Sequence, residues 1–400
     1  MIKCWLTCMK CAQTQPMGLV SRCACGGLLM VEYDLELVKR TLTKEALTDR
    51  ISSMWRYIEL LPVQRADAVV SLGEGWTPLI RLDRAEAQLP LKRLYVKREE
   101  QNPTGSFKSR GFSSAVSLLH ERGMTKAAVP SNGNAASALA AYCARAGMEA
   151  YVFVPKDCPE LIIQECLHYG AQLYLVDGFI HDAGRIVEEG KVTEGWFNTG
   201  TMREPGRVEG KKTMGLELAE QLDWQLPDVI VYPTGGGSGI IGLWKAFHEL
   251  KALGWVQGEL PRLVSVQEAG CQPVVDSVQG FGAGGSSSDT LPTGLRVPEP
   301  PDCGLIADLL KQTKGTAVAV TQTEILKAQQ SLGEQGISAS PEGAATWAGL
   351  MRLCEEGWIG AEDSVVLFNT SHALKYDFLL PKLTVPVVRT YADVVQWKGK

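Results

Sequence analysis

Long apolar runs are absent from this chain of 400 residues, and none approaches the roughly 18 to 20 residues that cross a membrane. An apolar signal core is also missing from the first residues, Met1 to Trp5. Charge of one sign is not in excess, with 40 basic against 45 acidic residues and a net charge of −5. The composition therefore predicts a soluble, cytoplasmic chain of two or three domains, with neither a membrane nor a nucleic acid as its partner.

A paired set of cysteines is absent too, because the eleven cysteines are an odd number. Six of them are scattered singly along the chain: Cys143, Cys158, Cys166, Cys271, Cys303 and Cys354. This pattern is typical of free thiols in a reducing cytosol and argues against a disulfide framework.

The other five cysteines fall within the first 25 residues. Cys8-x2-Cys11 and Cys23-x-Cys25 resemble the two knuckles of a zinc ribbon, in which closely spaced thiolates take corners of a tetrahedron. These four cysteines are the candidate ligands of a closed, structural zinc site. The second pair is tighter than the usual spacing, so Cys4 is an alternative ligand, and reduced thiols without metal are an equal alternative.

One lysine lies where a loop turns into a helix. The sequence Asn-Pro-Thr-Gly at 102–105 is turn chemistry, because proline fixes φ and glycine permits a positive φ. Residues 109–119 have helical character, which places Lys108 near a helix N-terminus. That positive helix end lowers the pKa of an ammonium, and a partly neutral lysine can attack an aldehyde. Lys108 is therefore a candidate Schiff-base lysine, against the ordinary alternative of a surface lysine.

Strands alternate with helices in the next part of the chain. Strands are expected at 126–130, 149–155 and 171–177, with helices at 135–146 and 160–169. Such alternation predicts a parallel α/β sheet. A loop of small polar residues, Ser131-Asn132-Gly133-Asn134, precedes the first of these helices. It is equally consistent with a capped turn and with an anion site at the helix N-terminus.

Three less regular stretches carry weaker signals. Residues 35–62 are charged and mixed, which indicates partial helix and an exposed linker. Residues 198–213 are rich in glycine and basic side chains, and they predict a solvated loop by default or a phosphate clamp. Residues 280–288 are rich in glycine and serine, which is typical of a flexible loop.

A glycine loop follows a buried strand expected at 228–232. Residues 233–242, PTGGGSGIIG, lead into a helix that reaches Leu250. Backbone amides in such a loop can surround a phosphate with no side chain in the way. Residues 237–242 also match the dinucleotide pattern G-x-G-x-x-G, with Glu268 after the next strand. Glu268 lies 26 residues after Gly242, beyond the usual position, which weakens the alternative of an NAD(P)-dependent oxidoreductase.

A last strand, expected at 364–368, delivers Thr370 and Ser371. Four loops are then expected to follow strands of one parallel sheet, and loops at one edge of such a sheet converge in space. Together they offer an imine-forming lysine, an oxygen or carboxylate binder, a phosphate cup and a hydroxyl group. Pyridoxal 5′-phosphate needs these partners.

The chain resembles the fold-type II pyridoxal-phosphate enzymes and, within them, the threonine synthase family. The resemblance covers nearly the whole chain and rests on segments 73–79 (GEGWTPL), 102–111, 131–135, 207–213 (RVEGKKT), the glycine loop and 370–375 (TSHALK). It implies an α/β chain like the tryptophan synthase β subunit, with two doubly wound parallel-sheet domains. The large cofactor domain would hold residues 35–110 and 216–400, the small domain 111–215, and a zinc-ribbon-like module 1–34. The fold type is commonly dimeric, so a homodimer is expected.

The resemblance also implies a role for each matching residue. Lys108 would form the Schiff base with the cofactor and carry protons, Asn134 would face the ring hydroxyl, and Thr370 would meet the pyridine nitrogen. The remaining candidates are the cofactor-phosphate loop Gly235, Gly236, Gly237, Ser238 and Gly239, and the substrate-binding residues Ser131, Asn132, Gly133, Ala135, Arg207 and Lys211. Of these, Arg207 matches the family arginine for a substrate phosphate, and Lys211 replaces a glutamine.

The activity implied is a lyase reaction of threonine biosynthesis, in which O-phosphohomoserine and water give threonine and phosphate by γ-elimination and β-addition. Departures from the family pattern leave rivals open. Ser109 replaces an aspartate, Ser371 replaces a glycine, the glycine loop is closer to that of amino-acid dehydratases, and segment 340–344 is atypical. The rivals are a cysteate synthase acting on phosphoserine and sulfite, and a serine/threonine dehydratase. The basic segment at Arg207 favours a phosphorylated amino acid.

Overall fold

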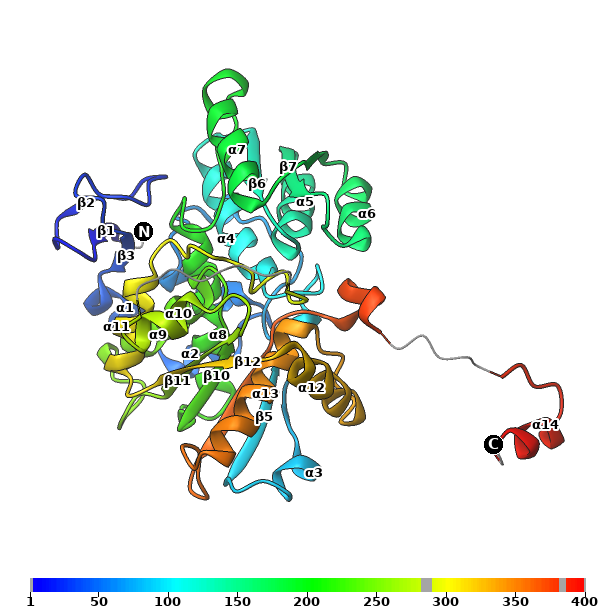
Figure 1. The fold of residues 1–400 in the computed structure, drawn as a ribbon. Helices are drawn as coiled ribbons and strands as arrows, with labels where there is room; N and C mark the ends of the chain where they lie inside the picture. The colour runs from blue at the N-terminus through cyan, green and yellow to red at the C-terminus, as the bar shows by residue number, and fades with distance from the viewer. Residues whose placement is uncertain (1–2, 282–289, 381–385, 399–400) are drawn as a thin grey trace.

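The structure is a computed structural model that describes residues 3–281, 290–380 and 386–398 (Figure 1). Most of the stretch expected to be a flexible loop, 282–289, lies outside the described residues. The described strands form three sheets: a three-stranded sheet at the N-terminus, a six-stranded sheet and a four-stranded sheet. None of the described helices is long and apolar enough to span a membrane.

The six-stranded sheet runs in the order β12-β11-β10-β13-β5-β4, parallel except for the antiparallel edge pair β4–β5. Its strands are β4 (Leu79–Arg81), β5 (Arg93–Arg98), β10 (Val229–Pro233), β11 (Arg262–Glu268), β12 (Thr316–Val320) and β13 (Ser364–Asn369). Alternate residues of a strand face opposite sides. Ile230 and Tyr232 therefore join one apolar cluster, whereas Val229 and Val231 join another.

Helices cover both faces of this sheet. On the side of Ile230 lie α8 (Gly206–Gln221), α9 (Ser238–Ala252), α10 (Pro273–Val278) and α11 (Cys303–Gln312). On the side of Val229 lie α3 (Asp83–Glu86), α12 (Gln322–Glu334) and α13 (Pro341–Glu355). The fold is therefore the doubly wound α/β arrangement that the strand and helix alternation predicts.

The four-stranded sheet, at the top of Figure 1, is parallel throughout and runs β8-β7-β6-β9. Its strands are β6 (Lys126–Pro130), β7 (Glu149–Pro155), β8 (Gln172–Val176) and β9 (Phe197–Asn198). Helices α4 (Lys108–Glu121), α5 (Asn134–Ala146) and α6 (Glu160–His168) pack on one face, and α7 (Ile180–Glu194) packs on the other. Gly147 ends α5 with φ +67°, the left-handed C-cap typical of glycine.

The N-terminal sheet is antiparallel, in the order β2-β1-β3, and its strands are β1 (Cys4–Cys8), β2 (Thr14–Pro16) and β3 (Leu29–Tyr33). It lies at the left of Figure 1 beside the six-stranded body. Tyr33 anchors it, because its hydroxyl donates to Glu209 of α8 at 2.8 Å and its ring lies 4.1 Å from Lys212 Nζ. The module is thus attached to α8 by a buried hydrogen bond.

The expectation of an exposed linker in residues 35–62 is wrong in its second half. This segment forms α1 (Leu35–Thr41), α2 (Lys44–Thr48) and the 3₁₀ helix η1 (Met54–Leu60). Met54, Trp55, Tyr57 and Leu60 are buried in η1. The sequence does not predict burial of this segment, because short 3₁₀ turns have no clear hydrophobic period.

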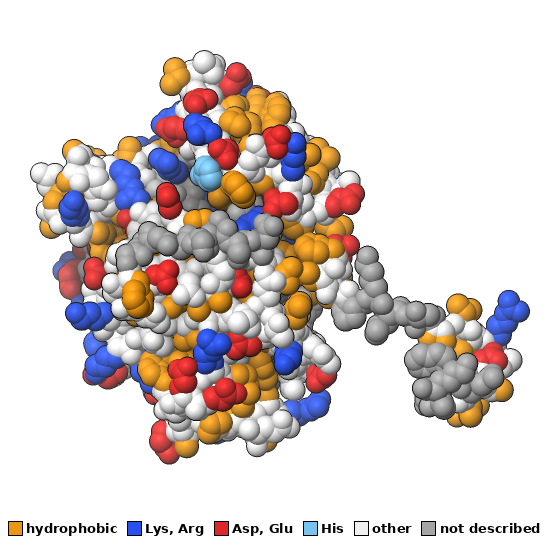
Figure 2. All heavy atoms as spheres, viewed as in Figure 1, with side chains coloured by type: hydrophobic (Ala, Val, Ile, Leu, Met, Phe, Trp, Pro, Cys, Tyr) orange, Lys and Arg blue, Asp and Glu red, His pale blue; other side chains and the backbone are white. Residues whose placement is uncertain are grey.

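The remaining described elements are short. They are η2 (Ala66–Ala68), η3 (Glu99–Gln101), η4 (Ala373–Leu379) and α14 (Tyr391–Lys398). Basic and acidic side chains are interspersed over the face drawn in Figure 2, without a continuous field of one sign.

The solvated loop expected at 198–213 is wrong from residue 206 onward, where α8 begins. The carboxylate of Glu204 starts this helix by accepting hydrogen bonds from the backbone N–H groups of Gly206 and Arg207, at 2.5 and 2.9 Å. Gly210 is needed for packing, since a Cβ there would lie 2.0 Å from the carbonyl oxygen of Arg110 in α4. The glycines of this segment therefore mark close helix contact rather than a loop.

A buried charge network joins α4, η3, β5 and α8. Arg110 donates to Glu99 at 2.7 Å and to Glu217 at 2.8 Å, and Lys97 also donates to Glu217. All four side chains are fully buried. Burial of these charges is tolerated only because each has a partner of opposite sign.

We predict that Arg110→Met destabilises the protein by about 3–5 kcal/mol, because it leaves Glu99 buried without its counter-ion. The free energy of urea unfolding measures the effect. Arg65→Met is the matched control, since Arg65 pairs with Asp67 on an exposed surface and should leave the unfolding midpoint unchanged. Equal shifts for the two variants would contradict a special role for the network.

Candidate active site

One cavity lies at the carboxyl ends of the parallel strands, where ligands bind in open α/β sheets. Four loops line it, three after β5, β10 and β13 of the six-stranded sheet and one after β6 of the four-stranded sheet, so the expectation that all four follow one sheet is wrong. The sequence-predicted residues found in its wall are Lys108, Ser131, Asn132, Gly133, Asn134, Ala135, Arg207, Gly235, Gly236, Gly237, Ser238, Gly239 and Thr370. Lys211 is the exception and lies behind the wall, against Ser238. Residues far apart in sequence are thus brought to one site.

Lys108 is the first residue of α4. The loop that precedes it, residues 102–107, is here called the lysine loop, and it is bonded to the residues that follow β13. The Phe107 N–H donates to the carbonyl of Thr370 at 3.0 Å, and Ser106 forms an isolated β-bridge with Ser371. Gly105 has φ +65°, which glycine adopts without strain. The lysine loop and the Thr-Ser loop therefore form one unit.

Ser109, which replaces the family aspartate, has a local partner. Its hydroxyl lies 2.7 Å from the hydroxyl of Thr104 and accepts from the Thr104 N–H at 3.3 Å. Ser109 is fully buried and is not part of the cavity wall. This departure from the family pattern therefore closes the turn and does not face a substrate.

The pKa of Lys108 is lowered to about 7. Burial is the main cause, the positive charge of Arg207 adds to it, and the carboxylate of Glu342 opposes it. At pH 7 about half of the amine is then neutral, which is the form that attacks an aldehyde. The environment thus supplies the activated lysine that the helix position alone only suggested.

The loop of residues 131–134, here called the asparagine loop, leaves polar atoms free in the cavity wall. The side-chain oxygens of Asn132 and Asn134 are buried, and neither has a hydrogen-bond partner within the described residues. Ser131 instead accepts from the N–H of Gly133 at 3.0 Å, and Gly133 is the N-cap of α5. The expectation of a side-chain N-cap is therefore wrong, and the two amides are open to a bound molecule.

The glycine loop is tightly enclosed by its neighbours. A Cβ on Gly235 would lie 2.2 Å from the carbonyl oxygen of Gly294, and one on Gly239 would lie 2.0 Å from the Tyr232 hydroxyl. Gly237 has φ +80° and caps α9, which starts at Ser238. Only glycine fits these positions, and the result is a turn of backbone at a helix N-terminus, where anions bind.

Arg207 is a buried cation without a salt bridge in the described part of the chain. Its guanidinium donates to the carbonyl of Thr199 at 2.7 Å, and its Nε has no hydrogen-bond partner among the residues that the structure describes. Burial lowers its pKa to about 10, whereas the charge of Glu204 raises it. Burial also raises the pKa of Glu204 to about 7. Positive charge in this wall is thus available to an anion in the cavity.

Several wall residues had no assignment from the sequence. Glu342 is held by the hydroxyl of Tyr376 and by the N–H of Gly294 at 2.9 Å, and its second oxygen has no partner among the described residues. Thr293 bonds the Tyr376 hydroxyl at 3.0 Å. The atypical segment 340–344 was the only signal for Glu342. The others lie in stretches without a motif, and only the fold places them at the cavity.

Pyridoxal 5′-phosphate fits this donor set. The site offers an amine with a pKa of about 7 at Lys108, a backbone turn at the start of α9, and free oxygens at Asn134 and Ser371. Thr370 is also in the wall. These groups match an aldehyde, a phosphate and the polar edges of a ring.

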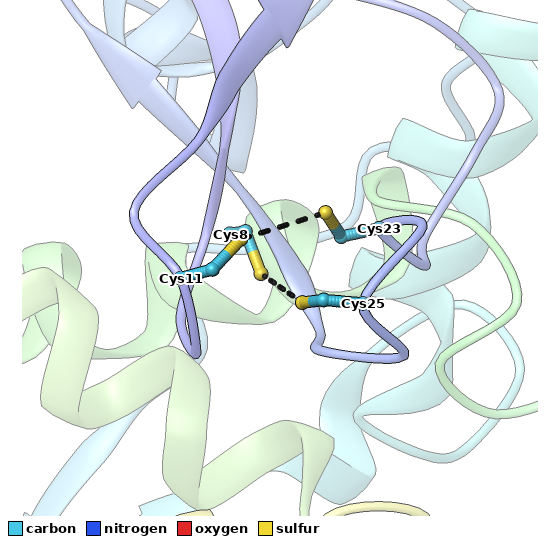
Figure 3. Close-up of side chains that lie close together, drawn as sticks. All are labelled: Cys8, Cys11, Cys23 and Cys25. Carbon is cyan, nitrogen blue, oxygen red and sulfur yellow. Dashed lines mark hydrogen bonds between the residues drawn. The ribbon is translucent and has the colours of Figure 1, made fainter.

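The cysteine cluster is a second, separate site (Figure 3). The sulfur atoms of Cys8, Cys11, Cys23 and Cys25 all lie within 4.8 Å of one another. Gly27 allows this approach, since a Cβ there would lie 2.6 Å from the Cys8 sulfur. The alternative in which Cys4 is a ligand is wrong. Its sulfur accepts a hydrogen bond from Gln64 at 3.1 Å, and burial raises its pKa to about 11.

We predict that reductive methylation of Lys108 by formaldehyde rises about tenfold per pH unit below pH 7 and levels off above pH 8, because only the neutral amine reacts. Glu342→Gln should move the midpoint to lower pH, since the carboxylate raises the Lys108 pKa. Mass spectrometry of peptides measures labelling at each pH, with exposed Lys327 as the internal reference. A midpoint near pH 10 for Lys108 would contradict the prediction.

The chain is similar to several known proteins. A family model described as "Pyridoxal-phosphate dependent enzyme" matches residues 70–371. The chain is 36% identical to threonine synthase of Methanocaldococcus jannaschii over 374 residues, and 36% identical to that of Methanosarcina acetivorans over 378, with 92% of each chain covered in both cases. It is 32% identical to the Mycobacterium tuberculosis threonine synthase over 322 residues, which cover 80% of this chain and 87% of that one.

Solved structures agree on the fold. Processed threonine deaminase isoform 2 from Solanum lycopersicum matches with a TM-score of 0.64 and 22% identity, over 76% of this chain and 82% of that one. Diaminopropionate ammonia lyase from Escherichia coli matches with a TM-score of 0.66 and 16% identity, over 80% and 94%. The family model, which includes residues 237–242, therefore favours pyridoxal phosphate over a dinucleotide as the ligand of this loop. The chain belongs to the pyridoxal-phosphate dependent enzymes of fold type II and, among them, to the threonine synthase family.

Proposed function

We propose that this protein is a threonine synthase, a lyase that converts O-phosphohomoserine and water to threonine and phosphate. The observation that carries the chemistry is Lys108, an amine with a pKa of about 7 in a cavity that also contains the glycine loop. The relatives named threonine synthase, similar over 92% of their length, support the substrate class.

Bound pyridoxal 5′-phosphate supplies an aldehyde and an electron sink for negative charge at the substrate carbon. We assign the rest of the work to side chains of this chain. Lys108 takes and returns protons at its Nζ, which its pKa of about 7 permits near neutral pH. Asn134 and Thr370 orient the ring, and residues 235–239 hold the cofactor phosphate. Residues 131–135 bind the substrate carboxylate at the start of α5.

Arg207 is assigned to the phosphate of the substrate. It is 2% exposed, has no acidic partner at bonding distance in the described residues, and belongs to the cavity wall. A guanidinium in a site that excludes water binds a phosphate more strongly than one in solvent. A phosphorylated amino acid therefore fits this wall better than free serine or threonine.

We predict that the protein releases one phosphate and one threonine per O-phosphohomoserine, and that Lys108→Ala abolishes the reaction. Arg207→Gln should lower kcat/KM by on the order of 10- to 100-fold, because a charge-assisted contact to phosphate is lost. Product analysis by chromatography with a phosphate assay measures both. Parallel reactions with phosphoserine plus sulfite, and with threonine alone, test the rival synthase and dehydratase. Turnover of either, without threonine from the first substrate, would contradict the proposal.

We propose further that the four clustered cysteines bind one structural zinc ion. The support is their mutual distance of at most 4.8 Å and the thiolate chemistry that four cysteines offer to a tetrahedral ion. Cys8 and Cys11 lie at and just after the end of β1, and Cys23 and Cys25 lie shortly before β3, so a metal would hold these two turns together.

Zinc content tests this second proposal. We predict one zinc per chain in the purified protein. The Cys4→Ser variant should retain the zinc and the Cys11→Ser variant should lose it, because Cys11 belongs to the cluster and Cys4 does not. Metal release measured with a chromogenic chelator gives the stoichiometry. Wild-type protein without zinc after growth in zinc, or equal loss in both variants, would sink the idea.

We also propose the domain division stated from the sequence, with 1–34 as a module, 111–215 as the small domain and the rest as the large domain. The strands of the three sheets fall within these ranges, whereas the boundary at residue 215 falls inside α8. A homodimer is proposed on the family resemblance, and a mass of twice the chain in light scattering checks it.

A further inference from the structure

Lys211 is a fully buried lysine of α8 that lies behind the glycine loop. Its Nζ donates to the Ser238 hydroxyl at 2.5 Å, and Ser238 is the first residue of α9. The same amine is 5.4 Å from the centre of the Phe107 ring, which Lys108 Nζ also contacts, at 3.9 Å. Lys211 is therefore in contact with Ser238 and close to Phe107, two residues that line the cavity.

Two glycines on neighbouring helices allow close approach to Lys211. A Cβ on Gly111 of α4 would lie 3.1 Å from Lys211 Cε, so this glycine leaves room for the side chain. A Cβ on Gly242 of α9 would lie 3.2 Å from the backbone carbonyl carbon of Lys211, so this glycine lets α8 and α9 pack closely.

The adjacent residue, Lys212, is a buried cation with a structural role, and its contacts differ from those of Lys211. Lys212 is equally buried, and its Nζ lies 2.7 Å from Glu209 and 2.8 Å from Glu249. Lys211 has no salt bridge in the described residues, and the carboxylate that acts on it, Glu204, is not bonded to its amine. A buried amine without an anion is costly as an ammonium, so its anion must come from a ligand.

The charged groups around Lys211 have one predominant sign. Arg207 on the same helix and Lys108 on α4 both lower its pKa, in addition to burial, which is the largest cause, and only Glu204 raises it. Together these effects hold the pKa of Lys211 well below the ordinary value.

We propose that Lys211 is a direct ligand of the cofactor phosphate, which it reaches beside Ser238 at the start of α9. The inference rests on pyridoxal 5′-phosphate as the cofactor and changes the sequence-based assignment of Lys211 to the substrate. Arg207, in the cavity wall, remains for the substrate anion. The two cations of α8, one turn apart, would then serve two different phosphates.

Binding of pyridoxal 5′-phosphate and of pyridoxal, which lacks the phosphate, tests the proposal on apoprotein. Lys211→Met and Lys211→Gln should weaken binding of the phosphorylated form on the order of 10- to 100-fold and leave binding of pyridoxal within about twofold. Absorbance titration gives both affinities, and Lys327→Met is the surface control. Equal weakening of the two ligands, or no weakening of either, would overturn the proposal.

Failure of this inference and failure of the proposed function give different results. Wild-type protein that binds pyridoxal 5′-phosphate, with no loss of affinity in either Lys211 variant, would overturn the inference and leave the proposed function intact. Wild-type protein that binds neither ligand would overturn both.

Discussion

The contact on which the site depends is the buried guanidinium of Arg110 between Glu99 and Glu217. Arg110 is two residues after the reactive lysine, Glu99 directly follows β5, and Glu217 lies on α8. The ion pairs therefore fix the start of α4 to the end of a central strand and to the helix that carries Arg207 and Lys211. Ion pairs in a protein interior without water are stable only when their geometry is good. These pairs therefore keep α4, β5 and α8 in one relative position.

Buried positive side chains have two roles in this molecule, and the presence or absence of a carboxylate partner distinguishes the two roles. Lys97, Arg110 and Lys212 each contact carboxylates and hold elements together. Lys108, Arg207 and Lys211 form no salt bridge within the described residues, and burial lowers the pKa of each. The unpaired set gathers around the glycine loop and the cavity. Charge left without a partner inside a folded chain is a cost that a bound anion or an aldehyde can offset.

The N-terminal module touches the same helix from its other side. Tyr33 of β3 contacts Glu209 and Lys212, which alternate along α8 with Arg207 and Lys211. One helix thus carries structural charges toward the module and ligand-binding charges toward the cavity. Glycines at 206 and 210 let it lie close against α4, which brings the charges of Arg207 and Lys211 close enough to act on Lys108.

The sequence by itself determined the alternation of strands and helices, the four loops and the lysine, because these depend on local period, turn residues and caps. It also pointed to the cysteine cluster through spacing alone. The tertiary structure decided what local signals cannot express. It turned residues 206–213 from a basic loop into a buried helix, placed Glu342 and Tyr376 in the cavity wall, and excluded Cys4 from the cluster. Burial, and therefore the pKa of Lys108, arises only when distant segments meet.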